Sequence, residues 1–206
     1  MAIVGLITLG IPMLLITIWV KVEMGSPICF VQCRVGKGGR LFRCHKFRTM
    51  VTDNSKGTIS MRGDDRITAL GRTLREWKLD ELPELVDVLM GRMSFVGPRP
   101  DVPGYADKLT GDDRDVLKML PGITGPATLK YRDEEQLIAD YVWTMLEAGD
   151  ERSAQEIARS YNDRVIYPDK VRLNCYYYRN YRLRDDLKMI ISTVFNRRMW
   201  YAEETI

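Results

Sequence analysis

The chain of 206 residues has little of what metal centres and disulfide-stabilised domains are built from. It has a single histidine, His45, which excludes a metal site with several imidazole ligands. Its four cysteines show neither Cys-X-X-Cys spacing nor the density of a disulfide scaffold, and are typical of reduced thiols in the cytosol. A metal ion here is therefore expected to be a hard one, held by carboxylates and phosphates, which indicates Mg2+.

The net charge is also small. A net charge of +3 is too small to indicate a nucleic-acid partner, which calls for a concentrated basic surface. No charged residue precedes Lys21, and the apolar run 1–20 is about as long as a bilayer core is thick. A signal peptide is disfavoured because no basic segment precedes the run and no small-residue cleavage site follows it. The basic residues after Val20 predict that the main domain lies on the cytoplasmic side of a membrane.

Pro12 leaves two interpretations of this first segment, residues 1–24. Proline inside a helix removes one hydrogen bond and costs roughly 3 kcal/mol. One interpretation is a kinked helix that spans the membrane, where such kinks are tolerated. The other is a helix, broken near Pro12, that enters the bilayer and returns to the same side. From the residues alone the kinked spanning helix is favoured.

Residues 25–206 are expected to form one mostly helical domain with a small β-hairpin. The segments 28–34 and 41–49 are strand-like and flank a Gly-Lys-Gly-Gly turn, which predicts the hairpin. A polar loop is expected over 51–65, followed by a helix from Arg66 on which Leu70, Leu74 and Trp77 share one face. Mostly helical structure is predicted from Asp133 onward.

The final helix is expected over residues 185–198. Its apolar residues 187, 190, 191, 194 and 195 form one stripe. A helix packed in the core explains this stripe, and so does an interfacial helix whose apolar face enters a membrane surface. The two interpretations remain about equally supported.

Asp80 and Glu81 are the candidate reactive pair. A helix is expected to begin at Asp80, with Pro83 in its first turn, and the helix dipole would keep the Asp80 carboxylate ionised. Adjacent helical residues point about 100° apart, so the two carboxylates cannot act across one bond. They can act as a nucleophile and a metal ligand. Taken alone, however, acidic residues at a helix start are usually caps.

Basic residues near this pair predict a phosphate-binding site. Arg75 precedes the pair, and Arg99 follows it between Pro98 and Pro100, which restrict the backbone so that the guanidinium is presented with little loss of entropy. Lys46 and Arg48 alternate on one strand face, which would direct both to a common ligand. A rigid surface turn and a solvated strand face are the simpler explanations of these two patterns.

Several motifs together resemble the bacterial sugar transferase family, the monotopic polyprenyl-phosphate phosphoglycosyl transferases. They are Lys46–Met50 (KFRTM), Leu79–Leu85 (LDELPEL), Gly91–Pro100 (GRMSFVGPRP) and Pro121–Gly125 (PGITG). The resemblance runs from about Ile11 to Phe195. It departs from the family pattern at Ile11, Pro126 and Asn174, and residues 131–168 form a longer insert than compact members carry.

The resemblance implies a fold and a mechanism. It implies a re-entrant membrane helix broken near Pro12, a compact cytosolic catalytic domain and interfacial helices, the last helix among them. It implies that Asp80 is the nucleophile, that Glu81 helps to hold Mg2+ beside Asp80, and that Arg75, Lys46, Arg48 and the segment 98–100 bind substrate phosphates.

The reaction expected from the resemblance is transfer of a sugar 1-phosphate from a UDP-sugar to a polyprenyl phosphate, such as undecaprenyl phosphate. UMP is released, and a sugar-phosphoryl aspartate is the intermediate. The enzyme would act at the cytoplasmic face of the bacterial inner membrane, in the first membrane step of capsule, O-antigen, exopolysaccharide or glycoprotein assembly. A glycosyl transferase that releases UDP and a non-catalytic membrane scaffold remain alternatives, and a homo-oligomer remains open.

Overall fold

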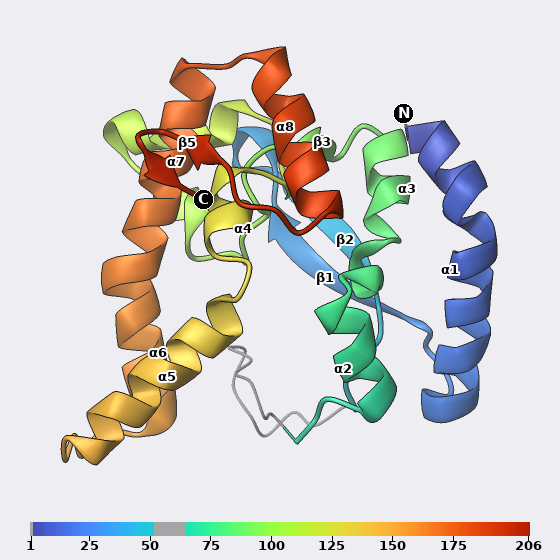
Figure 1. Ribbon diagram of the computed structural model, residues 1–206, viewed down its shortest axis with the longest axis horizontal. Helices are drawn as coiled ribbons and strands as arrows, with labels where there is room; N and C mark the ends of the chain where they lie inside the picture. The colour runs from blue at the N-terminus through green and yellow to red at the C-terminus, as the bar shows by residue number, and fades with distance from the viewer. Residues whose placement is uncertain (1, 52–64) are drawn as a thin grey trace.

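The computed structural model describes residues 2–51 and 65–206, with side chains from Gly5 onward, so that nearly all of the expected loop 51–65 lies outside the described residues. The predicted mostly helical architecture is confirmed (Figure 1). The helices are α1 (Ala2–Met24), α2 (Ala69–Glu76), α3 (Glu84–Leu89), α4 (Pro126–Lys130), α5 (Glu134–Glu147), α6 (Ala154–Tyr161), α7 (Tyr167–Arg179) and α8 (Leu183–Val194). The strands are β1 (Cys29–Val35), β2 (Leu41–Phe47), β3 (Ser94–Val96), β4 (Gly122–Thr124), β5 (Trp200–Tyr201) and β6 (Glu204–Thr205).

The predicted hairpin is present at the centre of the molecule. β1 and β2 pair antiparallel, from Cys29 opposite Phe47 to Val35 opposite Leu41, and a short 3₁₀ turn joins them. Gly38 and Gly39 in this turn have φ of 70° and 79°, a left-handed conformation that glycine adopts without strain. In Figure 1 the hairpin lies between α1, α2 and α3 on one side and the remaining helices on the other.

Helix α1 continues through Pro12, so the break expected at this residue is not found in the described chain. One missing hydrogen bond need not end a helix that keeps its other backbone bonds. Ile16 and Val20 are buried against Phe47 of β2 and against α2. By length and composition, α1 is the helix among the described residues that could cross a membrane.

The side of α1 that faces away from the domain is apolar and exposed. Its large hydrophobic side chains recur every three or four residues, as expected for one stripe of a helix. These side chains are Ile7, Ile11, Leu14, Leu15, Ile18, Trp19 and Val22.

Helix α2 is held against the segment that follows β2. The Thr68 hydroxyl caps the helix by accepting from the Gly71 N–H, and a Cβ on Gly71 would lie 2.0 Å from the Thr49 carbonyl oxygen. Leu70 and Leu74 are buried as predicted. The expectation for Trp77 was wrong: the helix ends at Glu76, and Trp77, beyond its last turn, is 74% exposed.

The insert 131–168 forms a helical hairpin of α5 and α6 with its own apolar core. Tyr141 and Tyr161 stack across this pair with ring centroids 3.9 Å apart. A π-helical turn, Asn162–Ile166, connects α6 to α7 just before Pro168. Such a turn accommodates the missing N–H and the bulk of the proline ring within a continuous helical run.

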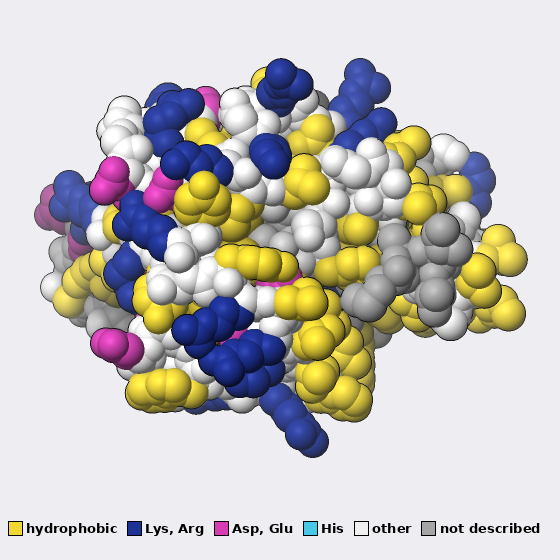
Figure 2. Space-filling model, turned by 90° about the horizontal axis from the view of Figure 1, so that it is seen from above, with side chains coloured by type: hydrophobic (Ala, Val, Ile, Leu, Met, Phe, Trp, Pro, Cys, Tyr) yellow, Lys and Arg dark blue, Asp and Glu magenta, His cyan; other side chains and the backbone are white. Residues whose placement is uncertain are grey.

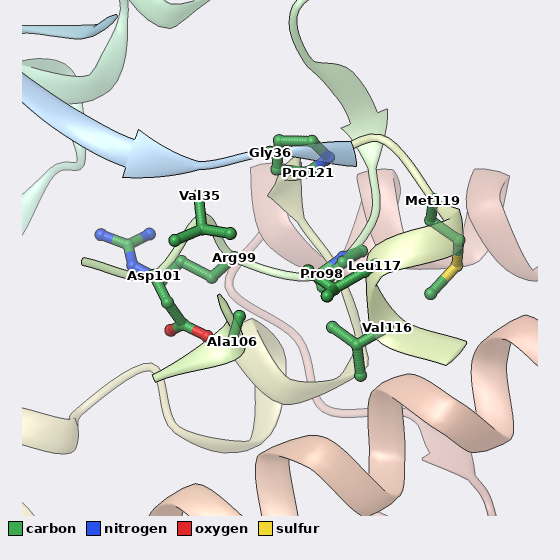
Figure 3. A pocket seen from close by; sticks show the side chains of 10 residues that line it. All are labelled: Val35, Gly36, Pro98, Arg99, Asp101, Ala106, Val116, Leu117, Met119 and Pro121. Carbon is green, nitrogen blue, oxygen red and sulfur yellow. The ribbon is translucent and has the colours of Figure 1, made fainter. Parts of the chain in front are cut away.

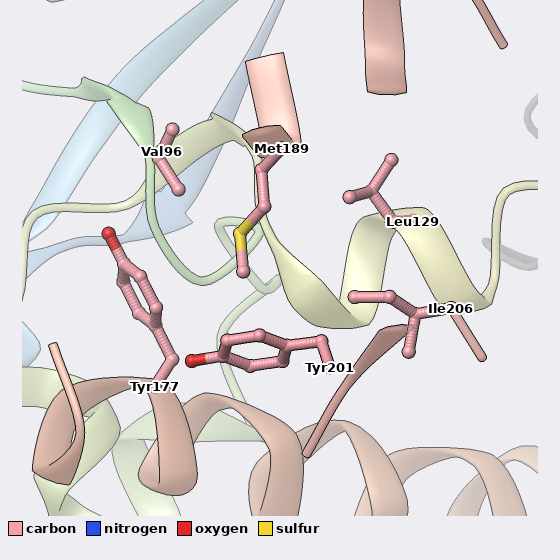
Figure 4. Close-up of a cluster of buried hydrophobic side chains, with 6 residues drawn as sticks. All are labelled: Val96, Leu129, Tyr177, Met189, Tyr201 and Ile206. Carbon is pink, nitrogen blue, oxygen red and sulfur yellow. The ribbon is translucent and has the colours of Figure 1, made fainter. Parts of the chain in front are cut away.

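The main core is the buried cluster of Val96, Leu129, Tyr177, Met189, Tyr201 and Ile206. Helix α8 packs on it through Met189 and exposes most of its predicted apolar stripe. The structure therefore corrects the interpretation of α8 as a buried core helix. Figure 4 shows Met189 meeting side chains from β3, α4, α7 and the chain end. Seen from above, a hydrophobic patch lies beside Lys and Arg side chains (Figure 2). The exposed apolar residues of α8 and its C-terminal end are Leu183, Leu187, Ile191, Val194 and Phe195.

The C-terminal hairpin β5–β6 closes the main core, because Tyr201 and Ile206 are buried in it. Neither this hairpin nor the parallel pair β3–β4 was predicted from the sequence. Their strands have two or three residues, too few for an alternating pattern to be recognised.

Candidate functional site

Asp80 and Glu81 lie in a short 3₁₀ turn between α2 and α3 and not at the start of an α-helix, as the sequence had suggested. Lys78, with φ of 54°, reverses the chain before this turn, and Pro83 is the N-cap of α3. The expected stabilisation of Asp80 by a helix dipole is therefore wrong. Both carboxylates are nonetheless buried, each residue being 8% exposed.

Glu81 is the anionic centre of a buried cluster. Its Oε1 accepts hydrogen bonds from Lys46 Nζ at 2.6 Å and from Arg99 Nη2 at 2.5 Å. Burial alone would raise the pKa of Glu81, but Arg99 and Lys46 outweigh it and hold this pKa well below its usual range. The cluster joins strand β2, the 3₁₀ turn and the Pro98–Pro100 segment.

Asp80 has a different environment although it is equally buried. Its Oδ1 has no hydrogen-bond partner among the described residues. Burial, followed by the neighbouring Glu81 charge, raises the pKa of Asp80, and Lys46, Arg75 and Arg99 oppose this rise. The expectation that Asp80 is readily ionised is therefore wrong: burial and the Glu81 charge outweigh the three cations that favour its charged form.

Three glycines fix the segment that carries Arg99. Gly97 N–H donates to the Thr124 carbonyl at 2.9 Å, and Gly122 N–H donates to the Pro98 carbonyl at 2.8 Å. A Cβ on Gly122 would lie 2.2 Å from Gly97 N, and one on Gly125 would lie 2.2 Å from Gly97 O. The two motifs GPRP and PGITG are thus two halves of one tightly packed unit.

The other side of this unit is backed by apolar side chains. Figure 3 shows a small pocket around Pro98 and Arg99, lined by Val35 of β1 and by residues of the segment 116–121. Arg34 adds a hydrogen bond from Nη1 to the Pro100 carbonyl at 3.0 Å. The predicted rigidity of Arg99 therefore comes from packing and hydrogen bonds as well as from its flanking prolines.

Arg75 reaches the same region from α2. Its Nε donates to Thr49 Oγ1 at 3.0 Å, and its Nη1 forms an ion pair with Glu135 of α5 at 3.0 Å. The insert therefore contacts Arg75, whose positive charge lowers the pKa of Asp80.

Lys46 and Arg48, predicted to be directed to a common ligand, take different partners in the structure. β2 ends at Phe47, and the Arg48 guanidinium donates to the Met24 carbonyl at the end of α1. A cation beside the last carbonyls of a helix is favoured by the helix dipole. Among the described residues, Arg48 thus secures α1 while Lys46 joins the carboxylate cluster.

The sequence-based reasoning missed two buried acidic residues of α3. Glu84 lies 3.4 Å from Lys46 Nζ and accepts from the Cys44 thiol at 3.4 Å. Asp87, fully buried, contacts His45 Nδ1 at 3.0 Å. The signal was present, since residues three apart on a helix share a face, and this face of α3 lies against the basic strand β2.

Asp80 and Glu81 offer carboxylate oxygens of the kind through which Mg2+ commonly binds, together with substrate phosphates. Asp80 Oδ1 has no partner among the described residues, and Glu81 is adjacent. In the part of the chain that the structure describes, no three His, Cys, Asp or Glu side chains form a cation cage.

Comparison with known proteins agrees with these motifs. The model of the family described as "Bacterial sugar transferase" matches residues 1–198. An undecaprenyl-phosphate galactose phosphotransferase of Salmonella typhimurium is 38% identical over 130 residues, 54% of this chain and 27% of that protein. A UDP-glucose:undecaprenyl-phosphate glucose-1-phosphate transferase of Caulobacter vibrioides is 39% identical over 123 residues, 57% of this chain and 46% of that protein.

A third relative is a UDP-N-acetylgalactosamine-undecaprenyl-phosphate N-acetylgalactosaminephosphotransferase of Aeromonas hydrophila, 37% identical over 123 residues. The match covers 55% of this chain and 28% of that protein. The matched regions thus span between about a quarter and a half of the length of these three relatives.

Replacement of Gly125 by alanine is expected to destabilise the protein by about 1–3 kcal/mol, because the new methyl group would overlap the Gly97 carbonyl. Thermal unfolding in detergent measures this effect. Gly10→Ala is the matched control: nothing lies within 4 Å of the added Cβ, so no loss is expected. Equal stability of the two variants would contradict the close approach of the two motifs.

Proposed function

The chain belongs to the bacterial sugar transferase family, and from that premise we propose that it transfers a sugar 1-phosphate from a UDP-sugar to a polyprenyl phosphate and releases UMP. The carrier we propose is undecaprenyl phosphate, which is printed in the names of several relatives. The observation that carries the proposal is the buried Asp80–Glu81 pair: Lys46 and Arg99 pair with Glu81, while Oδ1 of Asp80 has no hydrogen-bond partner among the described residues. The product would serve as the first lipid-linked intermediate of a bacterial surface polysaccharide or glycoprotein.

The first step is attack of an Asp80 carboxylate oxygen on the β-phosphorus of the UDP-sugar. The bond from this phosphorus to the bridging oxygen breaks, and that oxygen leaves with UMP. In the second step an oxygen of the polyprenyl phosphate attacks the same phosphorus, and the Asp80 carboxylate leaves. The product is a polyprenyl diphosphate sugar, and Asp80 is returned unchanged.

In both steps an anion attacks the phosphorus of a negatively charged phosphate group. Positively charged groups therefore have to lie beside the reacting atoms before the attack. Arg99 and Lys46 lie at Glu81, next to the nucleophile, and Arg75 lowers the cost of charge on Asp80. Mg2+ bound beside Glu81 would add neutralisation of the diphosphate charge. Glu135 holds Arg75 in the free protein, and we propose that a substrate phosphate takes its place.

We further propose that α1 enters the cytoplasmic leaflet and that both of its ends lie on the cytoplasmic side. Contacts at both ends support this placement: Gly5 lies beside Leu85 of α3, and Val20 is buried against the same domain. A helix that crossed the bilayer upright would separate these ends by about 30 Å of hydrocarbon. The outward apolar stripes of α1 and α8 would then lie in lipid and at its surface.

The Asp80→Asn variant is expected to release no UMP from any UDP-sugar and to form no covalent adduct, since an amide cannot act as the nucleophile. UMP release and intact-protein mass spectrometry measure the two effects. Asp115→Asn, which alters a surface ion pair with Lys118 and Arg179, is the matched control and should retain activity. Near-normal turnover by Asp80→Asn would refute the mechanism, and UDP as the released nucleotide would indicate simple glycosyl transfer.

Adduct formation should fall as the pH is lowered, and it should do so above the pH at which an ordinary aspartate, with a pKa near ~3.9, is protonated. The reason is that Asp80 attacks only when ionised and burial raises its pKa. Arg75→Gln removes a charge that lowers this pKa and should move the fall to higher pH. The rate of adduct formation against pH is the measurement. Arg72→Gln, exposed on the same helix, should leave the profile in place.

The placement of α1 can be tested with a cysteine at position 2. In intact spheroplasts, a membrane-impermeant thiol reagent should leave Ala2→Cys unlabelled, whereas in inverted vesicles both this residue and the exposed Cys33 should react. Labelling of residue 2 from the periplasmic side would mean that α1 spans the membrane.

A further inference from the structure

Lys46 lies between two buried carboxylates. Its Nζ is 2.6 Å from Glu81 Oε1 and 3.4 Å from Glu84 Oε1, so both are within ion-pair distance. Glu84 is 2% exposed, and it accepts a hydrogen bond from the buried Cys44 thiol. The reaction proposed above makes no use of Glu84, although a buried carboxylate is costly unless it is paired.

Two cations already lie at Glu81, where we propose that a divalent cation binds. Lys46 and Arg99 both donate to the same oxygen, Oε1. A metal ion bound to the other oxygen of Glu81 would still lie close to both positive groups, and the repulsion is strong where water is excluded. Movement of one of these cations away from Glu81 would lower this repulsion.

Lys46 is the cation that can move. Arg99 lies between two prolines in the segment that the glycine contacts hold, and its guanidinium is a rigid planar group. Lys46 carries a compact ammonium group on a flexible four-carbon stem. Its second acceptor, Glu84, is already within reach, so a small rotation would exchange one carboxylate for the other without leaving a buried charge unpaired.

We propose that Glu84 is a positioning residue that accepts Lys46 when a divalent cation occupies Glu81. This inference rests on the proposed function, because it assumes that Glu81 binds a metal ion during the reaction. Glu84 would touch neither substrate nor metal. Its effect on metal binding would depend entirely on Lys46. An acidic residue that attracts the metal ion by its negative charge would have an effect with or without Lys46.

A double-mutant cycle in the full chain, in detergent, tests this inference. Mg2+ is titrated by calorimetry into protein that carries saturating UMP, whose phosphate supplies the remaining oxygens. Glu84→Gln should weaken Mg2+ binding about tenfold, because Lys46 then stays on Glu81. In a Lys46→Met background, where no ammonium has to move, the same change should alter binding by less than about twofold.

Cys44→Ala is the matched control, since it removes the other partner of Glu84 and leaves Lys46 and both carboxylates in place. Its Mg2+ affinity should stay within about twofold of the unmodified chain. Thermal unfolding without Mg2+ shows whether each variant is folded. If Glu84→Gln has lost its fold, Glu84→Asp takes its place and should retain part of the Mg2+ affinity.

Two results would overturn the inference. One is an unchanged Mg2+ affinity in Glu84→Gln, and the other is a tenfold loss that persists in the Lys46→Met background. Absence of Mg2+ binding to the unmodified chain would overturn it as well. Failure of the proposed function is separate, since it would be seen as no UMP release by the unmodified chain in the presence of its substrates.

Discussion

The ion cluster at Glu81 is the constraint on which the rest of the structure depends. A carboxylate buried to this degree is stable only if its cations are held in place, because an unpaired charge in the interior costs several kcal/mol. Its two cations come from β2 and from the segment after β3, far apart in the sequence. The hairpin, the turn before α3 and the glycine-packed unit of GPRP and PGITG therefore have to be built together.

Patterns in the sequence correctly predicted those features that depend on interactions between residues close together in the chain. The hairpin followed from strand-like segments around a glycine-rich turn, and Leu70 and Leu74 followed from helical spacing. The Asp80–Glu81 pair and Arg99 were singled out as candidates from residue type and spacing, and the structure places them in one cluster. The family resemblance was the stronger indication of what the cluster does, because residue type alone left capping and surface turns as alternatives.

The wrong expectations have two causes, which are partners that only tertiary structure supplies and a local reversal of the backbone. Arg48 does not share a strand face with Lys46, because β2 ends at Phe47 and the Arg48 guanidinium donates to the Met24 carbonyl at the end of α1. Asp80 lies outside α3 because Lys78 reverses the chain and Pro83 starts a new helix. Glu84 resembled an ordinary residue of a first helical turn, and its role depends on a strand some forty positions earlier.

The contrast between Asp80 and Glu81 explains how neighbouring carboxylates of equal burial can serve different purposes. Glu81 holds its cations directly, which lowers its pKa, and this pairing lowers the nucleophilicity of its oxygens. Burial and the neighbouring Glu81 charge raise the pKa of Asp80. Its Oδ1 has no partner among the described residues, which preserves a reactive lone pair. If the order of the two residues were exchanged, the aspartate would stand at position 81, where Lys46 and Arg99 donate their hydrogen bonds. The order of the two residues therefore matters as much as their presence.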